Sequence, residues 1–276
     1  VWDSDWSLWS DAVHKAPHAY RAHMHLGGSL EAKGDVVGSL GSYTQAAQLR
    51  PDVPEVHYNL GNALRLSGRV TEAQQSWERA LEQDPEHLEA LLNLAASHQD
   101  AGDLTQTATL LRRAEAAHPQ SPEVWRRQGM VLHLTGNGAG ARAAFLHSLD
   151  LDSAWVKTHF SLANHYFSGG RMGDAAQHYE AALQYRPSHP GAAYNLADLH
   201  LRTGDPVAAE GVCRRALRHT SAQSKLYFLL GLALEARGQT ADALTNYRVF
   251  LRSGAARGSV LEDVRQHIER LESAID

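Results

Sequence analysis

The chain has 276 residues, 43% of them hydrophobic and 21% charged, and its 26 Lys and Arg against 31 Asp and Glu leave a formal net charge of −5. This composition is typical of a soluble folded protein, and the lack of a Lys/Arg block argues against nucleic acid or anionic lipid as a partner. The longest mainly apolar stretch runs from Leu226 to Leu234, far short of the roughly 20 residues that a membrane-spanning helix needs. We therefore expect no membrane insertion by this chain and, because Cys213 is its single cysteine, no internal disulfide.

A period of 34 residues runs through most of the chain. Glycine recurs at this interval without an insertion, at Gly34, Gly68, Gly102, Gly136, Gly170, Gly204 and Gly238. A column of small residues follows the glycines, at Ser39, Ala73, Thr107, Ala141, Ala175, Ala209 and Ala243. Four residues later comes a bulky column, at Tyr43, Trp77, Leu111, Phe145, Tyr179, Cys213 and Tyr247. Such a fixed period is the signature of a repeat architecture, so we expect a solenoid rather than one or two globular cores.

Residues 1–19 read as half a repeat. Prolines recur at the ends of the repeats, and Pro17 occupies this proline column, so the segment before it aligns with a second helix whose first helix is missing. Three tryptophans would pack partly against the missing helix, namely Trp2, Trp6 and Trp9. Either this helix is an atypical N-terminal cap, as solenoids often carry, or polypeptide before Val1 has been removed, or another chain covers the tryptophans.

Residues 20–255 read as seven repeats of two antiparallel helices each. In the second repeat Val56, Leu60 and Leu64 lie at helical spacing, and Gly68 then ends this first helix. Glycine suits that place because it adopts the left-handed conformation that closes many helix C-termini. The small column lets the paired helices approach closely, and the proline column stops the second helix. The expected fold is therefore all-α.

The period and residue types resemble the tetratricopeptide repeat. The second repeat carries the family pattern nearly completely, in Leu60, Gly61, Leu64, Gly68, Ala73, Trp77, Ala80 and Pro85. This resemblance implies a right-handed superhelical solenoid of antiparallel helix pairs. It also implies that the first helix of each repeat lines the concave face.

Residues 256–276 are expected to cap the last repeat with one helix. Val260, Val264, Ile268 and Leu271 make an apolar stripe, which predicts a helix from about residue 260 to 273. Ser259 with Glu262 three residues further on predicts a capping box at its start. A terminal cap is needed because each repeat of a solenoid contacts only its neighbours.

The N-terminal junction carries a second resemblance. Leu8-Trp9, Asp11, Val13, Pro17, Arg21-Ala22-His23 and Leu26-Gly27 are similar to the segment where bacterial polytopic membrane glycosyltransferase-like proteins pass into a C-terminal tetratricopeptide domain. This resemblance implies that the chain is the extracytoplasmic, periplasmic tail of a membrane protein. Without it, a cytoplasmic location is expected.

Asparagines recur on the predicted concave face, which the family places at positions 2, 5, 6, 9, 12 and 13 of the first helices. Asn59, Asn93 and Asn195 stand at position 6, and Asn62 and Asn164 stand at position 9. An amide both donates and accepts, so such a row can hydrogen-bond an extended peptide whatever its side chains. The row resembles the asparagine ladder of O-GlcNAc transferases. The alternative is that asparagine is simply common at these places in such repeats.

Aromatic and basic residues extend this candidate site. The aromatic anchors are Tyr58, Phe160 and Tyr194, and the basic residues are Arg126, Arg127 and Lys225. The aromatic rings would bind a ligand peptide or partner helix, unless neighbouring repeats half bury them. The carboxylate clamp of chaperone-docking repeats is not expected, because Tyr58 and Glu123 stand where its lysines should be.

No metal or cofactor is expected. Histidine is frequent, at 17 residues, but the cluster of His14, His18, His23 and His25 has no Cys or carboxylate to complete a ligand set. His57 and His159 fall in a column that normally packs. The glycine-rich stretch 136–140 superficially suggests a phosphate loop, but it follows no strand and falls in a turn between two helices.

The leading hypothesis from the sequence is a non-enzymatic scaffold that binds a peptide segment or partner protein in its concave groove. One alternative is an accessory domain that positions the acceptor of a membrane-bound glycosyltransferase-like protein. Another is a structural protein that self-associates through its N-terminal tryptophan face. No sequence motif points to catalytic residues.

Overall fold

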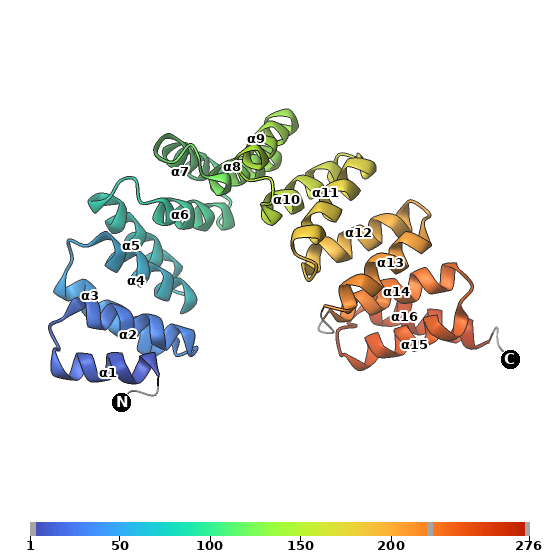
Figure 1. Cartoon of the computed structure of the whole chain (residues 1–276), viewed down its shortest axis with the longest axis horizontal. Coiled ribbons are helices and arrows are strands. Elements are labelled where there is room, and N and C mark those ends of the chain that lie inside the picture. The colour runs from blue at the N-terminus through green and yellow to red at the C-terminus, as the bar shows by residue number, and fades with distance from the viewer. Residues whose placement is uncertain (1–3, 220–222, 274–276) are drawn as a thin grey trace. The chain divides into compact units, whose positions relative to one another are not determined.

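The computed structural model describes residues 4–219 and 223–273, and every regular element in those ranges is an α-helix (Figure 1). The first helices of the repeats are α2 Tyr20–Ala32, α4 Pro54–Leu66, α6 Leu88–Asp100, α8 Pro122–Leu134, α10 Val156–Ser168, α12 Pro190–Arg202 and α14 Ser224–Ala236. The second helices are α3 Val36–Leu49, α5 Val70–Gln83, α7 Leu104–Ala117, α9 Gly138–Leu151, α11 Met172–Tyr185, α13 Pro206–Leu217 and α15 Thr240–Arg252. Helices α1 Asp5–Lys15 and α16 Ser259–Glu272 stand at the two ends. The all-α prediction is confirmed.

The turn inside each repeat is closed by the periodic glycine. All seven glycines of this column have a positive φ, from 73° at Gly170 to 81° at Gly136, whereas no non-glycine residue of the described ranges does. After α4 the amide of Gly68 donates to the carbonyl of Arg65, and the amide of Arg69 donates to that of Leu64. This is the hydrogen-bond pattern of a Schellman cap, which turns the chain sharply into the second helix.

The two periodic columns of the second helices form the packed interior. Every member of the small column is at most 1% exposed, and every member of the bulky column is at most 4% exposed. Cys213 fills its bulky place as a buried thiol, and burial raises its pKa to about 12. A thiol held protonated in this way serves as a small apolar filler rather than as a nucleophile.

The chain divides into two compact parts, Val1–Val131 and Leu132–Asp276, and the boundary falls inside α8. In the N-terminal part the paired helices α2 and α3, α4 and α5, and α6 and α7 pack side by side (Figure 1). In the C-terminal part the same holds for α10 and α11, α12 and α13, and α14 and α15. Each part is therefore a row of small cores between adjacent helices, as expected of a solenoid.

Histidine and tryptophan at position 4 of the first helices tie each repeat to the turn before it. His23, His57 and His159 each place Nε2 within 2.9 Å of a carbonyl six residues earlier, at Pro17, Pro51 and Ser153. The indole N–H of Trp125 donates to Pro119 in the same way, over 2.8 Å. Because the acceptor is a carbonyl, the imidazole must carry its proton on Nε2. The packing interpretation of His57 and His159 is confirmed.

At the N-terminal end α1 packs on α2. Trp9 stacks on His25 with 4.2 Å between ring centroids, and the Lys33 ammonium lies 4.2 Å from the centre of the Trp6 ring. Trp6 is 40% exposed. Trp2 lies outside the described residues. Trp9 therefore uses part of its surface on α2, and Trp6 uses part on Lys33, the residue that follows α2. No described residue of α1 is buried.

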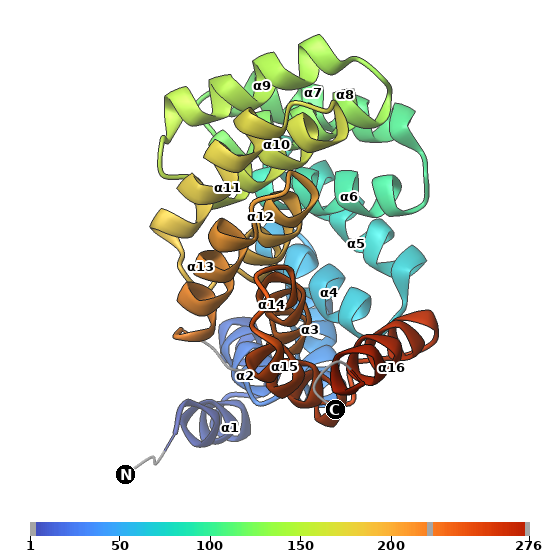
Figure 2. The same ribbon diagram turned by 90° about the vertical axis from the view of Figure 1, so that its right-hand side faces the viewer.

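At the C-terminal end α16 lies against α15 (Figure 2). Val264 and Leu271 are buried, but Val260 is 39% exposed, so only part of the apolar stripe reaches the last repeat. The expected capping box is wrong. The helix begins at Ser259 itself, its N-cap is Gly258 with a φ of 55°, and no side chain bonds the cap. The left-handed turn at Gly258 starts the helix one residue too early for Ser259 to cap it.

Close packing inside a repeat predicts an asymmetric response to added methyl groups. A Cβ at Gly61 of α4 would lie 2.5 Å from Nε1 of the buried Trp77, whereas a Cβ at Gly41 of α3 would meet nothing within 4 Å. We expect Gly61→Ala to destabilise the protein by about 1–3 kcal/mol through overpacking. The matched control Gly41→Ala should gain about 0.5–1 kcal/mol from helix propensity. Urea denaturation followed by circular dichroism measures both, and a raised midpoint for Gly61→Ala would contradict this account.

Candidate functional site

The candidate site lies on the face formed by positions 2, 5, 6, 9, 12 and 13 of the first helices, called here the first-helix face. In the N-terminal part it carries Tyr58, Asn59 and Asn62 of α4, Asn93 of α6, and Arg126 and Arg127 of α8. In the C-terminal part it carries Phe160 and Asn164 of α10, Tyr194 and Asn195 of α12, and Lys225 of α14. None of these side chains is fully buried, so all of them reach the surface.

A polar triad links two repeats in the N-terminal part. The side-chain oxygen of Asn62 accepts two hydrogen bonds, one from the indole N–H of Trp77 over 3.2 Å and one from the amide of Asn93 over 2.8 Å. Trp77 belongs to the second helix of the same repeat, and Asn93 belongs to the first helix of the next. The triad therefore fixes the spacing of α4, α5 and α6.

The same triad recurs 102 residues later in the C-terminal part. The oxygen of Asn164 accepts from the hydroxyl of Tyr179 over 2.6 Å and from the amide of Asn195 over 3.0 Å. Asn195 also donates to the Tyr179 hydroxyl, over 3.2 Å. Burial raises the pKa of Tyr179, in keeping with a neutral phenol that donates its proton.

Four of the five asparagines of the predicted row are thus engaged with one another. What Asn93 and Asn195 keep for a ligand is the side-chain oxygen, because it accepts no hydrogen bond from the described residues. Asn59 differs, since its amide only approaches the sulfur of Met24, at 4.0 Å. Its hydrogen-bonding groups are the least committed of the five.

The aromatic residues at position 5 are half-buried between repeats. Tyr58 packs on His87 with 5.0 Å between centroids, and Phe160 packs on His189 with 4.8 Å. These two histidines are again 102 residues apart, and each caps its own helix by accepting a backbone N–H. Burial, helped by the charge of Arg186, lowers the pKa of His189, which favours the neutral ring that a cap acceptor requires.

The two arginines predicted for the site share one carboxylate. Glu123 receives both Arg126 and Arg127, with the closest contacts at 2.7 and 2.8 Å, and Arg127 also donates to the carbonyl of Leu92 over 3.1 Å. Burial raises the pKa of Glu123, but the hydrogen bonds and charges of the two arginines outweigh it and hold the pKa at about 2. One carboxylate between two guanidiniums leaves one positive charge in this cluster.

A hollow opens on the first-helix face in each part. The N-terminal hollow has a volume of about 560 Å³ and is lined by Arg65, Asn93, Ser97, Asp100 and Arg127 among others. The C-terminal hollow has a volume of about 460 Å³ and is lined by Pro190, Tyr194, Gln223 and Lys225 among others. Predicted site residues therefore line both hollows.

We did not predict from the sequence that Glu123 pairs with two arginines or that His87 and His189 cap their helices. We also did not predict that the polar ends of Trp77 and Tyr179 hydrogen-bond the asparagines. The signal that could have found most of them is the spacing of 102 residues, three times the repeat, which relates Trp77 to Tyr179 and His87 to His189. The described residues hold no group of three or more His, Cys, Asp or Glu side chains arranged to bind a metal ion. Nor does any helix in those ranges have the length and apolar character needed to cross a membrane.

Two family models, both described as tetratricopeptide repeat, match the chain. One matches residues 7–54, 39–75 and 160–225, and the other matches residues 64–131. The chain belongs to the tetratricopeptide repeat family. A search of curated protein sequences finds no match.

Solved structures share the fold. A tetratricopeptide repeat protein from Parabacteroides merdae ATCC 43184 superposes with a TM-score of 0.62 at 18% identity, covering 92% of this chain and 98% of that one. A chain of the APC/C hetero-tetramer Cut9–Hcn1 superposes with a TM-score of 0.65 at 15% identity, covering 96% of this chain and 52% of that one. YrrB, described as a TPR protein with an unusual peptide-binding site, superposes with a TM-score of 0.51 at 18% identity, covering 68% of this chain and 96% of that one. At these identities the likeness shows the fold alone.

Removing Asn62 should cost far more stability than removing Asn59, although both lie on α4. Asn62→Ala leaves the N–H of the fully buried Trp77 and one amide N–H of Asn93 without their acceptor. We expect a loss of about 1–3 kcal/mol. Asn59→Ala, the matched control, should stay within about 0.5 kcal/mol of the wild type. Equal urea midpoints for the two variants would show that the triad does not stabilise the repeat pair.

The Glu123 cluster predicts a loss of stability in acid. Its folded pKa of about 2 is below the ordinary value of 4.5, so its contribution is present above pH 4.5 and is lost as the pH falls toward 2. We expect up to about 3 kcal/mol from this group over that window. Glu123→Gln should be less stable at pH 7 and show a flatter profile between pH 4.5 and 2. Thermal midpoints measured across this range test it, and parallel profiles for the two proteins would refute it.

Proposed function

We propose that the chain is a non-enzymatic interaction scaffold that binds an extended peptide segment on its first-helix face. The observation that carries this proposal is that the first-helix face of each part has a hollow lined by an exposed basic side chain, and a hydrogen-bonded asparagine triad on the same face. Asn93 and Arg65 line the N-terminal hollow. In the C-terminal part Lys225 and Tyr194 line the hollow, and Asn195 follows Tyr194 on the same helix.

The triads make the face suitable for a peptide backbone. Because Asn62 holds the amide of Asn93, the orientation of the Asn93 oxygen is set before a ligand arrives. A preset acceptor loses little rotamer freedom when a peptide N–H donates to it, which favours binding. Asn195, held by Asn164, offers a second acceptor of the same kind.

The basic residues select the chemistry of the peptide. Arg65 and Lys225 are exposed, and neither has an ion-pair partner in the part of the chain that the structure describes. Arg127, by contrast, is already paired with Glu123. An acidic side chain on the peptide would therefore find its partner at Arg65 or Lys225. Each such contact gives orientation and selectivity more than affinity, since both charges stay close to water.

The comparisons support this function at the level of the fold. The YrrB structure is described as having a peptide-binding site, and Cut9–Hcn1 is a complex between proteins. The two other functions considered from the sequence stay predictions. They are the acceptor-positioning domain of a membrane-bound glycosyltransferase-like protein and self-assembly through the N-terminal tryptophans, of which Trp9 already stacks on His25. The compartment, periplasmic or cytoplasmic, stays a prediction with them.

A peptide selection tests the proposal. Random peptides displayed on phage are selected on the immobilised chain, and the enriched peptides are measured against wild type, Arg65→Glu and Lys225→Glu by fluorescence anisotropy. We expect enriched peptides to contain Asp or Glu and to lose about tenfold or more in affinity for at least one charge-reversed variant, because an attraction becomes a repulsion.

Arg112→Glu is the matched control for this measurement. Arg112 is an exposed arginine on the second helix α7, away from the first-helix face, and its side chain bonds only to its own helix. The control should bind every selected peptide as the wild type does. Peptides that bind the two groove variants and the wild type equally well would rule out the first-helix face as the binding surface.

A further inference from the structure

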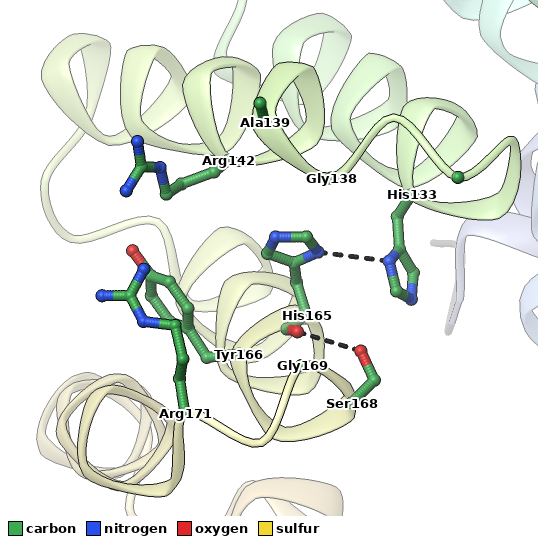
Figure 3. Close-up of a pocket in the computed structure, with 10 residues that line it drawn as sticks. His133, Gly138, Ala139, Arg142, His165, Tyr166, Ser168, Gly169 and Arg171 are labelled. Atoms are coloured by element: carbon green, nitrogen blue, oxygen red, sulfur yellow. Dashed lines mark hydrogen bonds between the residues drawn. The ribbon is translucent and has the colours of Figure 1, made fainter.

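A third hollow, in the C-terminal part, has a different chemistry from the peptide face. It has a volume of about 470 Å³ and is lined by His133 of α8, Gly138 and Arg142 of α9, His165 and Tyr166 of α10, and Arg171 in the turn before α11 (Figure 3). No Asp or Glu side chain lines it. The glycine-rich stretch 136–140, which we did not accept as a phosphate loop from the sequence because it follows no strand, contributes Gly136, Gly138 and Ala139 to its wall.

His165 departs from the repeat pattern at this place. The equivalent positions in the other repeats hold only small or aliphatic residues, namely Ser29, Ala63, Ser97, Val131, Leu199 and Ala233. Five of these six are buried, so the column normally packs the repeat. A Cβ at Gly138 would already be in van der Waals contact with the imidazole, at 3.6 Å from Cε1. The imidazole packs against Phe145, with 6.1 Å between ring centroids, but unlike the residues at the equivalent positions it also brings polar ring nitrogens to this place.

Two arginines bring positive charge to the hollow. Arg142 is exposed and has neither a hydrogen bond nor an ion pair with any residue that the structure describes. Arg171 uses only Nε, which binds Asp174 over 2.7 Å, and its guanidinium lies 4.4 Å from the centre of the Tyr166 ring. In the view of Figure 3 both guanidinium groups lie on the side of His165 that faces away from His133.

His165 hydrogen-bonds His133 and lies within reach of that charge. Their Nδ1 atoms are 3.1 Å apart, so one ring donates to the other and they cannot both be protonated there. Burial and the positive charges of His133, Arg142 and Arg171 lower the pKa of His165. Burial is the larger cause of this shift, but the positive charges that add to it also attract an anion and repel a metal cation.

We propose that this hollow binds a phosphate group, either inorganic phosphate or a phosphomonoester, between Arg142 and Arg171, beside His165, whose ring already bonds His133 and the backbone of Gly138. Guanidinium forks match the geometry of phosphate oxygens, and the terminal nitrogens of Arg171 and all those of Arg142 are uncommitted among the described residues. A doubly charged, tetrahedral anion can accept from donors on several elements at once, as these two arginines, on α9 and in the turn before α11, require. The hollow borders the proposed peptide face, because His133 and Ser168 stand at positions 12 and 13 of their first helices, but the proposal does not depend on peptide binding.

Nuclear magnetic resonance of the histidine side chains tests the proposal on the full chain. Inorganic phosphate and phosphoserine are titrated separately at pH 7 and low salt, and the imidazole signals of His133 and His165 are followed. We expect saturable shifts of both signals and about tenfold or more weaker binding in Arg142→Ala, because a charge-assisted contact is lost. Arg142 is exposed, so alanine in its place should leave the fold intact.

Two further variants make the test decisive. His165→Leu installs the residue type found at the equivalent Leu199 and should also abolish the phosphate response of His133. Arg186→Ala removes an exposed arginine of the same part that does not line the hollow, and it should bind as the wild type does. Tighter binding of phosphoserine than of phosphate would identify a phosphorylated side chain as the source, and the reverse would identify the free ion. Unsaturable shifts, or equal affinities for wild type and Arg142→Ala, would overturn the proposal.

Discussion

The fit of one bulky side chain against one small residue inside each repeat is the constraint on which the rest of the structure depends. Gly61 gives Trp77 room to lie flat on the first helix, as Gly27 does for Tyr43 and Gly231 for Tyr247. This close approach has a second effect, because it carries the polar end of the ring through to the first-helix face. The indole N–H of Trp77 and the hydroxyl of Tyr179 reach Asn62 and Asn164 only because the paired helices lie so near one another. The contact between the bulky and the small side chain thus determines both the packing inside the repeat and the position of the polar groups in the candidate site.

The repetition of the site after 102 residues follows from the nearest-neighbour character of a solenoid. A repeat senses only the repeats beside it, so a hydrogen-bonded arrangement that works between two repeats can be used again wherever the same residues recur. Asn62, Trp77 and Asn93 in one part, and Asn164, Tyr179 and Asn195 in the other, form such a unit. Tryptophan and tyrosine are exchangeable within it because each is an aromatic filler with a single polar donor at its far end.

The fold could be predicted almost entirely from the sequence, and the site only in outline. The glycine column specifies positive φ, and the small and bulky columns specify burial, because each follows from one residue and its own backbone or volume. The asparagine row was predicted to hydrogen-bond an extended peptide. Its hydrogen bonds between repeats, which engage Asn93 and Asn195, were not predicted, because such bonds depend on rotamers and inter-helix distances that no spacing encodes. The capping box failed for a related reason. The left-handed conformation of Gly258 moved the helix start by one residue, and a cap is lost by a shift of that size.

Charge pairing separates the groups that hold the fold from those that are available to a ligand. Glu123 lies between Arg126 and Arg127 in a half-buried cluster, where an unpaired charge would be costly, so those arginines are committed to the protein first. Arg65, Lys225 and Arg142 are exposed, and each lines a hollow without a carboxylate partner among the described residues. Water hydrates such an exposed cation at little cost, so the cation needs no partner in the protein and is available to a ligand that displaces the water. On the first-helix face each unpaired basic side chain lies alone near asparagine amides, an arrangement that suits a peptide ligand with occasional acidic side chains. Beside His165 two guanidiniums line one hollow, and although Nε of Arg171 is paired with Asp174, its terminal nitrogens and those of Arg142 can both serve an anion with several oxygens.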